Sequence, residues 1–278
     1  MYSNEIKTVD FLFPEEDLRE RNNLGFPNSE CNNFLYHYTN IEAALSIIES
    51  GSIWLTDYKG LNDKSEGELL YKELKKNTSN KKDKEKIEND YSLLTQNTFV
   101  SSFSSYGNLL TLWRGYGRVA LGFDYCKLLS RPEVEDKNGV EYQTSGLILQ
   151  HCRYLDDNEI KKDAQIVLAR GKSTLTESYD LLTIGSDFFD VKHPAFIDER
   201  EIRILCYLYN KNPHISDTGK KYIKLNFDTD ALKRIVVGPS KEQKQDEHKF
   251  HEMKIEVAGL KNIEIYRSTI PYVDTKIC

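Results

Sequence analysis

Two glutamates and an arginine alternate in the stretch DEREIRIL, where Glu199, Glu201 and Arg203 occupy every second position. On an extended strand alternate side chains share one face, so this spacing places two carboxylates and a guanidinium together. Such a group could act as a catalytic pair of acids, with Arg203 orienting or neutralising one of them. The alternative is a half-exposed strand whose polar face lies in water.

Two serines alternate in a similar way in the stretch VSSFSS. Ser102 and Ser104 are expected on one side of a strand, with Phe103 on the other. No Gly-x-Ser-x-Gly turn surrounds them, which argues against a serine hydrolase. On local sequence alone they are polar residues tolerated at a strand edge.

His37 lies between Tyr36 and Tyr38 in the run FLYHYTN, one residue before a helix-capping signal. A histidine on a strand is either a hydrogen-bonded core or edge residue or a contact to a ligand. The run itself leaves both interpretations open.

The segment LLTLWRGYGRVALGFD places Trp113 and Tyr116 beside glycines. A segment of this kind could fold over a flat ligand and supply an aromatic face to it. Core packing is the commoner role of a tryptophan, so both uses are kept.

The remaining candidates for chemistry are weak. His248 and His251 are three residues apart on an expected charged helix, but they lack metalloprotease spacing and fit a solvated face. His151 and Cys152 are adjacent on an expected strand, so they point opposite ways and cannot form a nucleophile and its base. The five cysteines contain no Cys-x-x-Cys pair, and neither a dinucleotide fingerprint nor a phosphate-binding P-loop is present.

Composition favours one large soluble domain in the cytoplasm. The 278 residues have a mean hydropathy of -0.59, and they contain no apolar run long enough for a membrane span and no visible secretory signal. A net charge of -6 argues against binding nucleic acid through the whole surface. A local basic groove remains possible, with Lys59, Lys64 and the lysines of residues 75–86 as weak candidates.

The first readable unit is a strand, a capped helix and a second strand. In TNIEAALSIIESG, Thr39 or Asn40 can cap the helix and Gly51 suits its left-handed end. The second strand is SIWLT. Residues 75–90 carry mixed charge and little to bury, which predicts a solvated loop or helix end.

The rest of the chain alternates blocks of strands with blocks of helices. Short strands are expected in FVSSFS, RVALGFD, VEYQ and LILQHCRYL, then helices across 157–190 with a glycine stop between them. Further strands are expected in EIRILCYLY, KYIKLNF, KRIVVGPS and NIEIY, with a charged helix at about 241–253. This segregation predicts an α+β fold with a mainly antiparallel sheet and peripheral helices.

Several of these pieces occur in the order typical of one bacterial family. They are LYHYTNIEAALSIIESGSIWL, LNDKSEGE, SSFS, LW with a tyrosine three residues on, VALGFD, VEY, KHPAFIDEREIR, IVVGPS and IYRSTIPY. The ordered set, from about residue 34 to 272, resembles the domain-of-unknown-function family 2971 (DUF2971), a divergent branch of the ADP-ribosyltransferase superfamily. The resemblance implies an N-terminal extension at 1–30 and a single ADP-ribosyltransferase-like domain at 31–278, with the split, mainly antiparallel sheets of that fold.

Members of that superfamily cleave NAD at the nicotinamide–ribose bond and pass ADP-ribose to an acceptor. The resemblance makes Glu201 the catalytic carboxylate and Glu199 the group that orients or deprotonates the acceptor. Losing nicotinamide leaves an oxocarbenium-like ribose, so a carboxylate that stabilises positive charge suits this chemistry.

By the same resemblance NAD is a substrate, no metal is needed, and the acceptor is a protein or a nucleic acid. An intracellular toxin or anti-phage defence effector held in check by an antitoxin or other inhibitory partner fits such an activity. The implied NAD-binding residues are His37, Tyr38, Thr39, Ser102, Ser104, Trp113, Tyr116 and Arg203.

Two departures from the superfamily pattern keep alternatives open. The middle motif is Ser-Phe-Ser instead of Ser-Thr-Ser, and His37 stands where enzymes with a serine motif have arginine. A degenerate module that binds NAD or ADP-ribose without turnover is one alternative. A metal-dependent hydrolase or nuclease effector is another.

Overall fold

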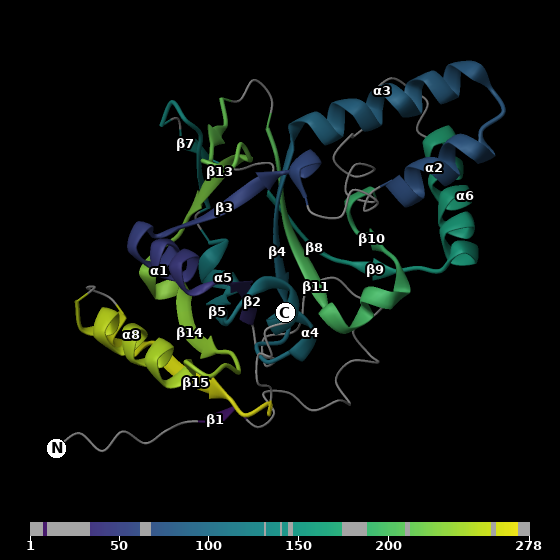
Figure 1. Ribbon diagram of the computed structural model, residues 1–278. Helices are drawn as coiled ribbons and strands as arrows, with labels where there is room; N and C mark the ends of the chain where they lie inside the picture. Colours follow the sequence, from purple (N-terminus) through teal and green to yellow (C-terminus); the bar gives the residue numbers. More distant parts are fainter. Residues whose placement is uncertain are drawn as a thin grey trace. The chain divides into compact units, whose positions relative to one another are not determined.

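A computed structural model describes residues 8–9, 34–61, 68–130, 132–139, 141–143, 147–173, 188–208, 212–256 and 260–271 (Figure 1). The chain forms two compact units, each built from separate stretches of sequence. The first unit comprises Met1–Ile53, Phe103–Pro132 and Asn226–Cys278, and the second comprises Trp54–Ser102 and Glu133–Leu225. Strands β3 (Ser52–Asp57) and β4 (Thr98–Ser104) therefore each contain a unit boundary.

The first unit contains a mixed sheet. Its strands, in spatial order, are β1 (Thr8–Val9), β15 (Glu264–Ser268), β14 (Leu232–Val237), β5 (Val119–Asp124) and β2 (Phe34–Thr39). The pairs β2–β5 and β5–β14 are antiparallel, whereas β14–β15 and β15–β1 are parallel. The predicted strands around His37, VALGFD, IVV and IEIY are thereby confirmed.

Helix α1 (Ile41–Ser50) follows β2 as the sequence predicts. Asn40, one of the two candidate caps, accepts a 2.7 Å hydrogen bond from the backbone N–H of Ala43. Gly51 ends the helix in the left-handed conformation, with φ of 60°. Among the residues that the structure describes, the other helical elements of this unit are α4 (Leu110–Tyr116), α5 (Tyr125–Leu128), η5 (Thr229–Ala231), η6 (Leu260–Asn262) and the charged helix α8 (Gln243–Glu256).

The second unit contains a longer sheet. Its strands, in spatial order, are β8 (Leu147–His151), β11 (Glu201–Tyr207), β4, β3, β13 (Lys221–Asn226), β6 (Glu133–Glu135) and β7 (Glu141–Gln143). β12 (His214–Ile215) pairs with β13, and β9 (Arg153–Tyr154) pairs with β10 (Val191–Lys192) in a small parallel sheet. The pairs β8–β11, β3–β4, β6–β7 and β12–β13 are antiparallel, which confirms the α+β, mainly antiparallel prediction.

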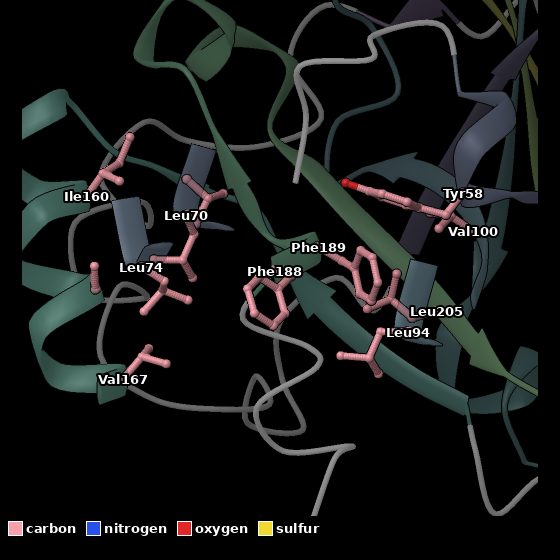
Figure 2. Packing of buried hydrophobic residues seen from close by; sticks show 12 residues of the cluster. Tyr58, Leu70, Leu74, Leu94, Val100, Ile160, Val167, Phe188, Phe189 and Leu205 are labelled. Atoms are coloured by element: carbon pink, nitrogen blue, oxygen red, sulfur yellow. The ribbon is translucent and has the colours of Figure 1, made fainter. Parts of the chain in front are cut away.

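Helices and a buried apolar cluster complete the described part of the second unit. The helices are α2 (Glu68–Asn77), α3 (Lys81–Asn97) and α6 (Asp157–Ser173), and the 3-10 turns are η3 (Tyr58–Gly60) and η4 (Pro194–Glu199). Leu70, Leu74 and Leu94 of the helices pack with Val100 of β4 and Leu205 of β11 (Figure 2). This cluster fixes which face of β4 and β11 is turned toward the helices.

Two expectations about helices need correction. Residues 75–90 were expected to be a solvated loop or helix end, and residues 75–77 are indeed the end of α2. Residues 81–90, however, are the first part of α3, which Asn80 caps by accepting a 3.0 Å hydrogen bond from the N–H of Lys82. Further along α3, Ile87, Tyr91 and Leu94 supply an apolar side. Gly171 is not a stop, since α6 continues to Ser173.

Some predictions lie outside the described residues: most of the extension at 1–30, Lys64, and the helix expected across 174–187. Among the helices that the structure does describe, none has the length and apolar character needed to cross a membrane.

Candidate active site

Glu201 is the first residue of β11, and its side chain is 7% exposed. The first six residues of this strand are all buried. The expected half-exposed strand with a polar face in water is therefore wrong, because consecutive side chains point to opposite faces and those on both faces are buried. A carboxylate in such a place needs cationic partners or hydrogen-bond donors.

Arg203 holds Glu201 in a forked ion pair. Its Nε donates to Oε1 of Glu201 at 2.8 Å, and one terminal nitrogen donates to Oε2 at 3.1 Å. The other terminal nitrogen donates to the carbonyl oxygen of Phe189 at 2.7 Å. The prediction that Glu201 and Arg203 share a strand face is confirmed, and the planar guanidinium fixes the carboxylate in one orientation.

Lys192, on β10, joins the two glutamates. Its ammonium lies 2.6 Å from Oε2 of Glu201 and 2.6 Å from Oε2 of Glu199. The lysine side chain is only 2% exposed. Two negative and two positive side chains are thus collected in one small, largely dry volume.

Burial and charge act on Glu201 in opposite directions. Burial alone would raise the pKa of the carboxyl, but Arg203 and Lys192 outweigh it and lower the pKa to about 2. Glu201 is therefore ionised at neutral pH, as a group that stabilises developing positive charge must be.

Glu199 is not on the strand that carries Glu201. It is the last residue of η4, and Arg200 follows in the left-handed conformation with φ of 49°. The expected alternation from Glu199 to Glu201 is wrong for this reason, since strand geometry begins only at Glu201. The shared ammonium of Lys192, and not strand alternation, brings the two carboxylates together.

Backbone contacts anchor the start of β11. The N–H of Glu201 donates to the hydroxyl of Tyr154 at 2.7 Å, and the carbonyl of Glu201 accepts from the N–H of Cys152 at 3.0 Å. Burial raises the pKa of Tyr154, so its hydroxyl stays protonated and can accept while keeping its own proton. Tyr154 thus fixes the backbone position of Glu201, from which the carboxylate side chain projects.

A second ion-pair network supports the same region. Arg153 makes a two-pronged contact with Asp190, at 2.7 and 2.8 Å, and pairs with Asp163 of α6 at 2.8 Å. Gln150 also donates to Asp190 at 2.7 Å. Asp190 directly precedes β10, so this network positions the strand that carries Lys192.

Ser102 lies on the face of the sheet that carries Arg203. The N–H of Leu208 donates to the carbonyl of Asn97 at 3.0 Å, which places the end of β11 beside the start of β4. Val100 and Leu205 belong to one apolar cluster, so they lie on one face. Side chains two residues away, Ser102 and Arg203, share that face by alternation.

The other predicted NAD-binding residues belong to the first unit. His37 faces Phe103 with ring centroids 5.4 Å apart, whereas Tyr38 points into the opposite side of its strand. The hydroxyl of Tyr38 donates to the carbonyl of Tyr106 at 2.8 Å and accepts from the N–H of Leu109 at 3.0 Å. Convergence of His37, Ser102 and Glu201 on one cleft stays a prediction.

The two candidate aromatic residues differ in exposure. Trp113 is buried, packs against Tyr38 with ring centroids 4.6 Å apart, and donates its indole N–H to Asn108 at 3.1 Å. Tyr116 is 45% exposed. Stacking of either ring on nicotinamide stays a prediction, but only Tyr116 of the two offers a large accessible face.

Several of the family-like pieces meet inside the first unit. Gly117 has φ of 136°, and a Cβ there would overlap the carbonyl of Thr39 and lie 2.7 Å from the nitrogen of Asn40. A Cβ at Gly238, in IVVGPS, would lie 2.7 Å from the Trp113 ring. Packing therefore accounts for the glycines at these two positions, which are not themselves evidence of chemistry.

Sequence reasoning missed Lys192, Tyr154 and Asp190 as parts of the site. Lys192 opens the stretch KHPAFIDEREIR, so its position near the glutamates was visible. Its role was not, because the seven-residue offset to Glu199 is bridged by a 3-10 turn that the pattern does not predict. Within the described ranges, no group of three or more His, Cys, Asp or Glu side chains is arranged to hold a metal ion.

Comparisons with known proteins add little to this geometry. No family model matches the chain, and no curated protein does. Among solved structures the chain is similar to Thermus sp. 2.9 DarT in complex with NAD+, over 87% of this chain and 97% of that chain. The sequence identity is 10% and the TM-score 0.33, a likeness too weak to carry an argument about fold or function.

Proposed function

We propose that the protein is an NAD-dependent ADP-ribosyltransferase that modifies a macromolecular acceptor, with Glu201 as its catalytic carboxylate. The observation that carries this proposal is the ionised Glu201 held beside Glu199 by the ammonium of Lys192. The ordered resemblance of the sequence to the DUF2971 family supports it. An intracellular toxin or defence role, controlled by an inhibitory partner, is the biological setting that we infer.

The chemistry requires a negative charge where the ribose becomes positive. When the bond between C1′ of the ribose and the nicotinamide nitrogen breaks, its electron pair leaves with nicotinamide and the ribose becomes oxocarbenium-like. The fixed carboxylate of Glu201 stabilises that charge without reorganising. The acceptor then bonds to C1′, and Glu199, which is less buried, receives the acceptor's proton.

A degenerate binding module is the second candidate, and a specific observation favours it. Both carboxylate oxygens of Glu201 are already engaged by Arg203 and Lys192, and the side chain is 7% exposed. A substrate hydroxyl would have to compete for those oxygens. A module of this kind would bind NAD or ADP-ribose without releasing nicotinamide.

Release of nicotinamide from labelled NAD by the purified protein separates the two functions. We expect Glu201→Gln to reduce release by at least about 100-fold, since a fixed charge at the reacting centre is lost. Glu201→Asp keeps the negative charge but moves it back by one methylene. The variant should therefore fold and still release nicotinamide more slowly. Glu133→Gln, at an exposed position on β6, is the matched control and should not change release.

The acceptor is tested with NAD labelled in its ADP-ribose half and a cell lysate. Digestion of the products with nuclease or with protease shows which class of macromolecule carries the label. Binding of NAD by calorimetry, with no nicotinamide release in buffer or lysate, would establish the degenerate module and refute the transferase. Equal release by wild type and Glu201→Gln would also refute the assignment of Glu201.

A further inference from the structure

A row of stacked aromatic rings lies on the sheet of the second unit, apart from the cluster around Glu201. The rings of Trp54 and Tyr222 lie face to face, with centroids 3.7 Å apart and planes 14° apart. The Tyr222 ring also stacks with the imidazole of His214, at 5.1 Å and 21°. These side chains come from β3, β13 and β12, and we call them the aromatic row.

Core packing does not account for the end of this row. Trp54 is 46% exposed, whereas its neighbours Ile53 and Leu55 are fully buried and anchor β3 on the other face. A large aromatic ring that is stacked on a partner and left partly open to solvent is able to accept a flat ligand.

The aromatic row shares a sheet face with the candidate site. Thr56 pairs with Val100, and Val100 packs with Leu205 in one apolar cluster. By alternation, Trp54 lies on that face of β3, and Arg203 lies on it in β11. The strand order β13–β3–β4–β11 therefore leads from the aromatic row to Glu201 across a single face.

A few basic groups accompany the rings. Lys224 follows Tyr222 by two residues, so it projects from the same face of β13, and its ammonium lies 3.2 Å from Glu135. Lys220, just before the strand, is exposed, whereas Lys221 is exposed on the opposite face of β13. This is enough charge for one or two phosphate contacts, but not for an extended basic groove.

We propose that the aromatic row binds an unpaired base of a single-stranded nucleic acid, which stacks on the open face of Trp54. Aromatic side chains bind single strands in this way with little regard to sequence, because every base has a flat face. In a duplex that face is covered by neighbouring bases. The assignment of a single strand as the acceptor rests on the proposed transferase function. The binding of the strand to Trp54 does not depend on that function.

Equilibrium binding without NAD tests the inference. The probe is a fluorescein-labelled single strand of about 12 nucleotides, within the range that one such surface covers, followed by anisotropy at low salt. Trp54→Ala should weaken binding about 5- to 150-fold, which is the loss of one base stack. Trp54→Phe should give a smaller loss and shows that folding is intact, and Tyr222→Ala should weaken binding as well.

The matched control is Ile215→Ala. Ile215 is 63% exposed on β12, next to His214 in sequence but on the other side of the strand, and its removal should leave affinity unchanged. Because stacking and not phosphate neutralisation dominates, log Kd should change with log salt by a slope no steeper than about 1.4, the value for two phosphate contacts.

Three results would overturn the inference: no binding of any single strand, equal binding by wild type and Trp54→Ala, or equal affinity for a duplex. Competition by AMP or NAD as strong as that by the strand would also overturn it, because the row would then recognise a free nucleotide. The two proposals fail differently. Nicotinamide release without strand binding contradicts only this inference, and strand binding without nicotinamide release contradicts only the transferase.

Discussion

The ammonium of Lys192 lies 2.6 Å from a carboxylate oxygen of Glu201, and the lysine side chain is 2% exposed. A buried ammonium in this position does two things. It keeps the carboxylate ionised, and it occupies an oxygen that a ribose hydroxyl would have to reach in the proposed transferase reaction. Lys192 therefore has two opposing effects. It keeps Glu201 charged for catalysis, and it also makes Glu201 part of a buried ion pair that substrate must compete with.

Replacement of Lys192 by methionine should raise the pKa of Glu201, because one of the two cations that lower it is removed. The acid limb of the pH profile of nicotinamide release should then move to higher pH. The unfolding free energy should fall by about 3 to 5 kcal/mol, since a buried ion pair loses one partner. Release assays across pH and urea unfolding measure the two effects.

Two further variants serve as controls for Lys192→Met. Lys192→Arg keeps the positive charge and should restore most of the stability and the original acid limb. Lys161→Met changes an exposed lysine of α6 and should alter neither quantity. An acid limb that does not move in a folded Lys192→Met protein would show that this lysine does not set the ionisation of Glu201.

Acid should weaken the protein through Glu201. Its folded pKa of about 2 lies below the ordinary glutamate value of 4.5, so the ion pairs contribute fully above about pH 4.5 and are lost as pH falls toward 2. The contribution is on the order of 3 kcal/mol. Urea unfolding at pH 7, 5 and 3 should show the loss, and Glu201→Gln should flatten the curve. An equally steep curve in the variant would assign acid sensitivity to other groups.

Loss of the Tyr154 hydroxyl should leave the N–H of Glu201 without its acceptor. We expect Tyr154→Phe to lower the unfolding free energy by about 1 to 3 kcal/mol, the cost of a buried donor left unpaired. Hydrogen exchange at the Glu201 amide should quicken, and this reports the local contact directly. Tyr222→Phe, which keeps its ring in the stacked row, is a comparison with a tyrosine that has no part in this bond. Unchanged protection of the amide would contradict the assigned role.

Gly117→Ala should destabilise the protein by about 1 to 3 kcal/mol, because φ of 136° is a conformation that side chains rarely adopt. The added Cβ would also overlap the backbone of Thr39 and Asn40, two and three residues after His37. Gly115→Ala is the matched control: it lies inside α4, and nothing is within 4 Å of its Cβ position. It should be neutral or stabilise the helix by about 0.5 to 1 kcal/mol. Thermal melts of both variants check the contrast.

Elements with a strong local signal could be predicted from the sequence. Asn40 and Gly51 bracket α1, the alternation in β4 and β11 is visible in the residues, and β2 and β5 appear as short runs of apolar and aromatic residues. Helix α3 was missed, because its charged first half has nothing to bury and only its cap and its later apolar positions show that it is a helix. Tertiary contacts, not local propensity, decide such segments.

In the candidate site too, contacts within one strand could be predicted and contacts between elements could not. Glu201 and Arg203 are two apart on a strand, so their contact follows from alternation. The links of Lys192 to Glu199 and of Tyr154 to Glu201 depend on a 3-10 turn and on a small parallel pair of strands. The Tyr154–Glu201 contact joins segments 47 residues apart. The Lys192–Glu199 contact spans seven residues, and it forms only because of the turn between them. No pattern in a single sequence specifies either contact.

The interleaving of the two units along the chain limits what can be done with this protein in the laboratory. Each unit is assembled from separate stretches, and β3 and β4 cross the boundary without a linker. Neither unit can be cloned as an uninterrupted fragment, and a protease cut in either strand would damage both. Truncation mapping is therefore unsuited to locating its activity, whereas point substitution in the intact chain is the appropriate tool.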